Sequence, residues 1–128
     1  MTPLEEAKNR AAAEIDSAAG TARLRYITVT HGQEQVYIEK VNEAMDFVTN
    51  KYPVELSAFP FITAEAEATG LQPQIVATII LQKRTEWIKK MASIEKIRIE
   101  GKINVHRAPG IKIINDVKHK YTEELNLL

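Results

Sequence analysis

The sequence predicts an all-α fold, a small bundle of four to five helices organised on one long helix, and three observations lead to this prediction. First, apolar residues recur at spacings of three, four or seven between Pro73 and Arg107. Second, capping signals, prolines and glycines divide the rest of the chain into helical stretches. Third, the strand-like segment at residues 26–29 has no evident second strand to pair with, and residues 111–114 favour a helix over a strand.

The long helix over 73–107 is the element on which the others are expected to pack. At about 1.5 Å per residue it is roughly 50 Å long, which is more than a chain of this size needs to enclose a core. Gly101 costs about 1 kcal/mol relative to alanine inside a helix, so a bend or an early end near it is an alternative. The predicted core anchors on this helix are Ile80, Trp87, Met91 and Ile94. For Trp87, a contact point for a partner is the alternative.

The N-terminal helix begins with a capping box. Thr2 is the cap, Pro3 takes the first helical position and Glu5 takes the third. The helix-forming residues after Gly20 favour continuation to about Arg25. Small residues on one side of this helix allow a neighbouring helix to approach closely, and they are Ala7, Ala11, Ala18 and Ala22, together with Ile15.

Residues 26–29 are expected to form an extended connector that leads to a second capping box, with Thr30 as its cap and Gln33 three residues later. A helix over roughly 31–50 follows, with an apolar face of Val36, Tyr37, Val41, Ala44, Met45 and Val48. Residues 51–60 contain two prolines and read as a loop. Pro60 then begins a short helix that Gly70 ends.

A second break at residues 108–110 divides the chain into a helical core domain, 1–108, and a C-terminal amphipathic segment, 109–128. This segment has apolar residues at helical spacing. It is expected either to pack back on the long helix or to bind a partner, because an uncovered apolar stripe usually marks an interaction surface. The candidate partner-binding residues are Ile111, Ile114, Val117, Tyr121, Leu125 and Leu128.

The net charge is zero, but its two signs are unevenly distributed. Residues 1–70 hold 6 Lys/Arg against 11 Asp/Glu, and residues 71–128 hold 11 against 6. This division favours acidic helices that pack against basic ones, within the chain or between subunits. We expect Lys83 and Arg98 to lie over the core with their charged ends paired to acids of the first two helices. The alternative is a basic surface on the long helix that binds nucleic acid.

No catalytic, cofactor-binding or metal-binding residues are predicted, and we expect the protein not to be an enzyme. The chain has no cysteine, and its three histidines are not spaced as metal ligands on one helix. Glu39 and Glu43 lie one helical turn apart, which suits an acid/base pair, but like-charged neighbours on a solvated face are commoner. No run reaches the roughly 20 apolar residues of a membrane span, so no membrane association is expected.

Two stretches together resemble small helical proteins and domains of tailed bacteriophage tails. They are EIDSAAGTARLRYITVTHGQEQVYIEK at 14–40 and TEWIKKMASIEKIRIEGKINV at 85–105. The shared pattern is an alanine-rich helix that ends AAG-x-AR, an aromatic residue, a helix start of the GQE type, and a later helix with W, IE, R and GK in this order. The segment after Pro109 lies outside this pattern.

The resemblance implies a non-catalytic structural or assembly role in the phage tail, exercised by protein–protein binding. The implied partners are phage tail proteins, such as fibre or baseplate subunits, with self-association into a homo-oligomer as a further option. The implied location is the host cytoplasm during assembly, as chaperone or adaptor, or the finished virion tail. A nucleic-acid-binding or regulatory helical protein is the alternative function.

Overall fold

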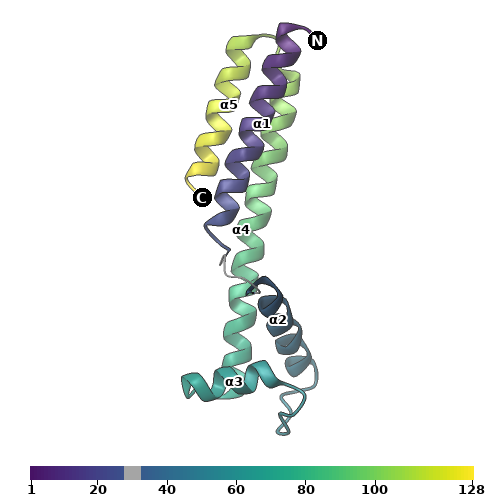
Figure 1. Ribbon diagram of the computed structural model, residues 1–128, viewed down its shortest axis with the longest axis vertical. Coiled ribbons are helices and arrows are strands. Elements are labelled where there is room, and N and C mark those ends of the chain that lie inside the picture. The colour runs from purple at the N-terminus through teal and green to yellow at the C-terminus, as the bar shows by residue number, and fades with distance from the viewer. Residues whose placement is uncertain (28–32) are drawn as a thin grey trace. The chain divides into compact units, whose positions relative to one another are not determined.

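The computed structural model describes residues 1–27 and 33–128, which contain five helices and no strand (Figure 1). The helices are α1 (Pro3–Leu24), α2 (Gln33–Thr49), α3 (Pro60–Thr69), α4 (Pro73–Arg107) and α5 (Ile111–Asn126). The predicted all-α fold with one long helix over 73–107 is therefore confirmed. The predicted capping box at Thr30, and the predicted helix start at residue 31, lie outside the described residues.

The described chain groups into two units, and α4 contributes to both of them. The first unit comprises residues 1–27 and 89–128, and the second comprises residues 28–88, of which 33–88 are described. This grouping differs from a division at residue 108, because α5 packs against α1 and shares one core with it. The C-terminal segment thus packs back, which was one of the two expected outcomes.

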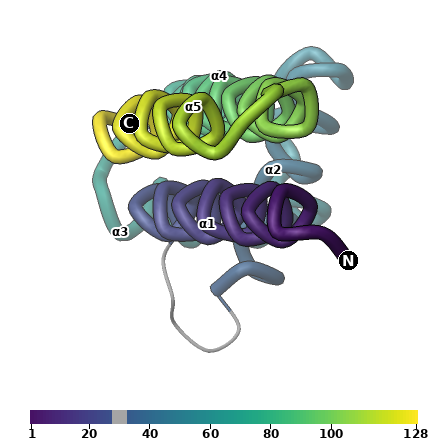
Figure 2. The backbone as a smooth tube through the Cα atoms, turned by 90° about the horizontal axis from the view of Figure 1, so that it is seen from above, coloured from purple at the N-terminus to yellow at the C-terminus, as the bar shows by residue number. Residues whose placement is uncertain are grey.

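The first unit is a three-helix bundle of α1, α5 and residues 89–107 of α4. Lys8 contacts His106 and Arg23 contacts Glu95, so α1 and α4 run antiparallel. Figures 1 and 2 both show α1 beside the pair formed by α4 and α5. Helix α1 begins as expected, since Thr2 and Glu5 form the capping box, and α1 continues through Gly20.

Small side chains let α1 approach its neighbours closely. The buried core of this unit consists of Ala7, Ala11, Ile15, Ala19, Ala22, Ile94, Val105, Ala108, Ile114, Tyr121 and Leu125. Five of these eleven residues belong to α1, and four of the five are alanines. The predicted alanine face of this helix is therefore its packing face, although Ala18 is only partly buried and Ala19 is fully buried.

Gly101 lies where the three helices of the first unit meet. A Cβ atom built on it would lie 3.0 Å from Cβ and Cγ of Tyr121 and 3.1 Å from Cδ1 of Ile15. The long helix runs through Gly101 as predicted, so the alternative of an early end there does not hold. The absence of a side chain is what allows α4 to approach both neighbours, and this compensates for the low helix propensity of glycine.

The second unit packs α2, α3 and residues 73–88 of α4 around large side chains. Its buried core is Val41, Ala44, Phe47, Phe59, Ile62, Val76, Ala77 and Ile80. The ring of Phe47 meets that of Phe59 edge to face, with 5.0 Å between centroids, and that of Tyr52 at 5.7 Å. Such aromatic pairs add roughly 0.5–1.5 kcal/mol beyond the area that they bury.

Two helix ends in the second unit are capped in different ways. Helix α3 begins at Pro60 and ends at Gly70 as predicted, and Gly70 adopts the left-handed conformation that glycine tolerates (φ 76°). Lys51 takes the same role after α2 at φ 60°, although it carries a side chain. Its N–H bonds to Val48 O, while the N–H of Tyr52 bonds to Phe47 O. These two backbone hydrogen bonds close α2 before the loop.

Candidate functional site

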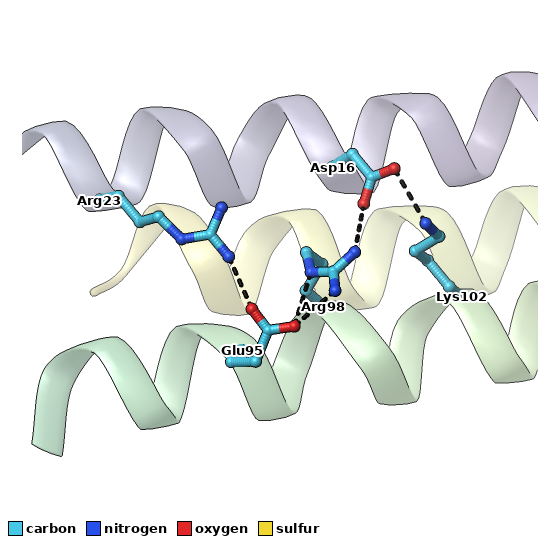
Figure 3. A network of polar contacts seen from close by, with 5 residues as sticks. All are labelled: Asp16, Arg23, Glu95, Arg98 and Lys102. Atoms are coloured by element: carbon cyan, nitrogen blue, oxygen red, sulfur yellow. Dashed lines mark hydrogen bonds and ion pairs between the residues drawn. The ribbon is translucent and has the colours of Figure 1, made fainter. Parts of the chain in front are cut away.

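The most extensive polar cluster of the described residues joins α1 to α4 in the first unit (Figure 3). Asp16 accepts a hydrogen bond from Arg98 Nη1 and one from Lys102 Nζ, each at 3.0 Å. Glu95 accepts a bond from Arg98 Nε at 3.0 Å and one from Arg23 Nη2 at 2.7 Å. We call these five residues the ion-pair network.

The sequence places the members of the network on facing helix surfaces. Asp16 and Arg23 are seven residues apart, which is two turns of α1. Glu95, Arg98 and Lys102 are separated by three and four residues and share one side of α4. Arg98 is the only member that contacts both acids. The network therefore fixes the axial position of α1 along α4.

The electrostatics of the network favour the charged forms of Asp16, Glu95 and Arg98. Partial burial of Asp16 raises its pKa, but hydrogen bonds and charges from Lys102 and Arg98 outweigh this effect, so the pKa is lowered overall. The hydrogen bond from Arg98 lowers the pKa of Glu95. The bonds to Glu95 and Asp16 raise the pKa of Arg98.

These shifts move the two acids away from the range in which they could exchange protons near neutral pH. A general acid or base works best with a pKa near the operating pH, and a carboxyl group reaches it only when its pKa is raised. Ionised carboxylates that are already hydrogen-bonded to cations are what a structural contact needs. The geometry thus assigns the ion-pair network to packing between helices.

The expected pairing of basic and acidic helices is found in the first unit. Arg98 pairs with Asp16 of α1 as predicted, and Lys118 pairs with Glu14 of α1 at 3.1 Å. Lys83, which was expected to do the same, is exposed, and no ion pair joins it to the described part of the chain. The prediction therefore holds for Arg98 and fails for Lys83, which lies in the second unit.

Glu43, considered above with Glu39, has a structural task in the second unit. Its carboxylate accepts hydrogen bonds from the N–H groups of Phe61 (3.1 Å) and Ile62 (2.8 Å) at the start of α3. Phe59, at the cap position of that helix, makes no side-chain capping bond. Glu43 thus caps α3 from α2, while Glu39 accepts a bond from Gln35.

The candidate partner-binding residues of α5 divide into buried and exposed positions. Ile114, Tyr121 and Leu125 are buried in the core of the first unit, and Val117 and Leu128 are partly buried against it. Only Ile111 is largely exposed, at 51%. The segment folds back on the chain and covers its own stripe, so in this conformation most of these side chains are not available to another protein.

The four predicted core anchors of α4 have different surroundings. Ile94 is buried in the first unit and Ile80 is buried in the second. Met91 is partly buried against the core of the first unit. Trp87 is half-buried and belongs to neither core, and its ring lies 6.2 Å from that of Tyr37. The helical spacing identified one stripe correctly, but this stripe serves two separate cores.

Two exposed apolar surfaces appear instead, one on each unit. The outer α4 face, in the first unit, has Ile99 and Ile103 exposed at 45% and 42%. Each is two residues from buried Gly101, and about 100° per residue turns them away from the core. The outer α2 face, in the second unit, has Ile38 and Met45, both exposed at 44%.

The prediction that Met45 belongs to the apolar packing face of the second helix is wrong, because this side chain is exposed. Met45 follows buried Ala44 directly and precedes buried Phe47 by two residues, so it lies off the buried side of α2. Ile38 is not part of the predicted apolar stripe. Its position off this stripe was the signal in the sequence that its side chain faces solvent. Helical spacing shows which apolar residues share a side, but it does not show which of two sides is buried.

Two further absences apply to residues 1–27 and 33–128. No group of three or more histidine, aspartate or glutamate side chains there could hold a metal ion. None of the helices in this part of the chain has a stretch long and apolar enough to cross a membrane.

Compared with known proteins, the chain matches no protein-family model, no curated protein and no solved structure.

Proposed function

We propose that this protein acts by binding other proteins through the exposed apolar faces of its helices. The observation that supports this proposal is the pairing of Ile99 with Ile103 on α4 and of Ile38 with Met45 on α2, all of them more than two-fifths exposed. Apolar side chains grouped on one face of a helix are typical of surfaces that another helix covers.

The setting that we propose is the assembly or the structure of a bacteriophage tail, with tail proteins as partners. This part of the proposal rests on the two sequence stretches at 14–40 and 85–105. The ion-pair network does not favour a catalytic role for its acids, because Asp16 and Glu95 are held ionised. Nucleic-acid binding is the weaker alternative, since Arg98 and Lys102 of α4 are already paired with Asp16.

Site-specific crosslinking tests the proposal. A photoreactive amino acid replaces Ile103 in one variant and Asn115, an exposed polar residue of α5, in a matched control. Both variants are produced in cells that assemble phage tails, and the crosslinked products are identified by mass spectrometry. We expect a tail protein to be crosslinked from position 103 and not from position 115. Equal products from both positions, or none from position 103, would count against the proposal.

A further inference from the structure

The charges around the two exposed apolar faces have opposite signs. On the outer α2 face, Ile38 and Met45 are flanked by the exposed acids Glu34, Glu39 and Asp46. The basic residue of this helix, Lys40, points away and pairs with Glu65 of α3. The described charged side chains along the outer α2 face are therefore all acidic, and the neutral exposed side chain of Asn42 lies between Ile38 and Met45.

The outer α4 face carries the opposite charge. Ile99 and Ile103 are accompanied by the exposed basic residues Lys89, Lys96 and Arg107. The exposed acids of α4 beside these basic residues are Glu100, which lies 3.8 Å from Lys96, and Glu86, which precedes Lys89 by three residues. Glu95, at the edge towards α1, is neutralised by Arg23 and Arg98. The outer α4 face is thus apolar at its centre and predominantly basic at its edges.

The two units carry opposite net charges as well. Residues 28–88 contain 4 Lys/Arg against 8 Asp/Glu, which leaves 13 against 9 in residues 1–27 and 89–128. The second unit therefore has a formal charge of −4 and the first unit one of +4. Opposite potentials on two partners speed their encounter and select the correct surfaces.

We propose that these two faces bind each other between copies of the chain, so that the outer α2 face of one copy covers the outer α4 face of a second copy. Matching of the two apolar centres removes four half-exposed side chains from water. Matching of the edges places Glu39 and Asp46 of one copy against Lys89 and Lys96 of the other. When no other protein is present, the occupant of each face is thus a second copy of this chain.

Contacts between two identical faces are less favourable than contacts between the outer α2 face and the outer α4 face. Two outer α2 faces would bring six carboxylates together without a cation, and two outer α4 faces would oppose lysines and an arginine. Like charges that face each other across an interface are unfavourable, so the charge pattern selects unlike faces. Repetition of a contact between unlike faces gives either a closed assembly or an open one.

This inference deepens the proposed function, because it names one partner for the exposed faces. It can fail on its own, since its test contains no other protein, whereas the crosslinking experiment identifies tail proteins. The measurement is the mass of the full chain by light scattering over a range of concentrations. We expect the measured mass to exceed that of one chain. This mass should fall as the salt concentration rises, because salt screens the attraction between the two faces. A single-chain mass at every concentration overturns the proposal.

Charge reversal identifies the faces. One variant carries Glu39→Lys and Asp46→Lys, which makes both faces basic, and another carries Lys89→Glu and Lys96→Glu, which makes both acidic. Each variant alone is expected to self-associate about tenfold more weakly than the original chain. A mixture of the two, and a chain with all four changes, is expected to recover association. Unchanged association in the single variants, or no recovery in the mixture, overturns the proposal.

A matched control separates this effect from net charge. Glu55→Lys with Glu67→Lys makes the same change of charge in the second unit, at exposed residues that lie off α2. This control is expected to self-associate as the original chain does. Circular dichroism checks the helices of all variants, which are expected to be retained because every changed side chain is exposed. Weakening by the control equal to that of the α2 variant would show that net charge, and not the face, decides association.

Discussion

The two units of this protein form helical cores by different physical means. The first unit uses alanines, one glycine and a network of ion pairs to bring three helices close together. The second uses a cluster of aromatic rings, with a short helix that is capped by a glutamate from its neighbour. Small side chains make a core that depends on close approach, whereas large ones make a core that depends on a few residues filling space.

This comparison predicts that the second unit is the more sensitive to loss of one large side chain. We expect Phe47→Ala to lower the free energy of unfolding of the second unit by about 3–5 kcal/mol, because it removes a buried ring and leaves a cavity. Denaturant unfolding followed by the fluorescence of Trp87, which belongs to this unit, measures the effect. Val54→Ala, at a residue exposed to 98%, serves as the control and is expected to change little. An equally small effect of both variants would refute the prediction.

The first unit should instead be sensitive to the addition of a single methyl group. Gly101→Ala gains about 1 kcal/mol of helix propensity but places a methyl group against Tyr121 and Ile15. Overpacking costs roughly 1–3 kcal/mol, so we expect a net destabilisation of up to about 2 kcal/mol. Thermal unfolding followed by circular dichroism provides the measurement.

Gly20→Ala is the matched control for this change. Nothing lies within 4 Å of the Cβ that it would add to α1, so the variant should be more stable by up to about 1 kcal/mol. The two glycines thus predict opposite signs for the same substitution. Stabilisation by both would show that the contact of three helices at Gly101 has room for a methyl group.

The smallest expected effect concerns the charges of the first unit. The pKa of Asp16 is lowered in the folded protein, so its ionised form stabilises the fold above the ordinary value of 3.8, and this contribution is lost as the pH falls below it. We expect Asp16→Asn to cost about 0.5–1 kcal/mol at pH 7, because the side chain is partly exposed. The difference from the original chain should shrink near pH 3.

Urea unfolding at both pH values measures this difference. The control is Asp116→Asn, at an exposed position of α5, which should change stability little at either pH. If Asp16→Asn and the original chain differed by the same amount at pH 7 and pH 3, the contribution of Asp16 would not come from its charge.

Local signals along the chain were sufficient to predict most of the helices. Thr2 with Glu5, Pro60 and Gly70 act through neighbours within four residues, and the structure shows each of them in its predicted role. The long helix over 73–107 follows from spacing that extends over many turns. Such signals are readable in a sequence because capping and periodicity depend on residues that are close together in the chain.

The candidate surfaces were harder to predict, because exposure is a property of packed neighbours. The stripe of α5 has the spacing of both a core face and a binding face, and only the packing of α5 against α1 decided that Ile114 and Leu125 are buried. Ile99 and Ile103 are as apolar as Ile94 of the same helix, yet they face away from the core.

The sequence by itself determined the helices, their order and the charge imbalance, because each depends on composition or on short-range spacing. The tertiary structure alone decided that α4 serves two cores, that Gly101 admits two neighbouring helices, and that Glu43 caps a helix 17 residues further along the chain. These features require contacts between residues that are distant in the sequence. No local pattern encodes such contacts, since they arise only when the helices pack.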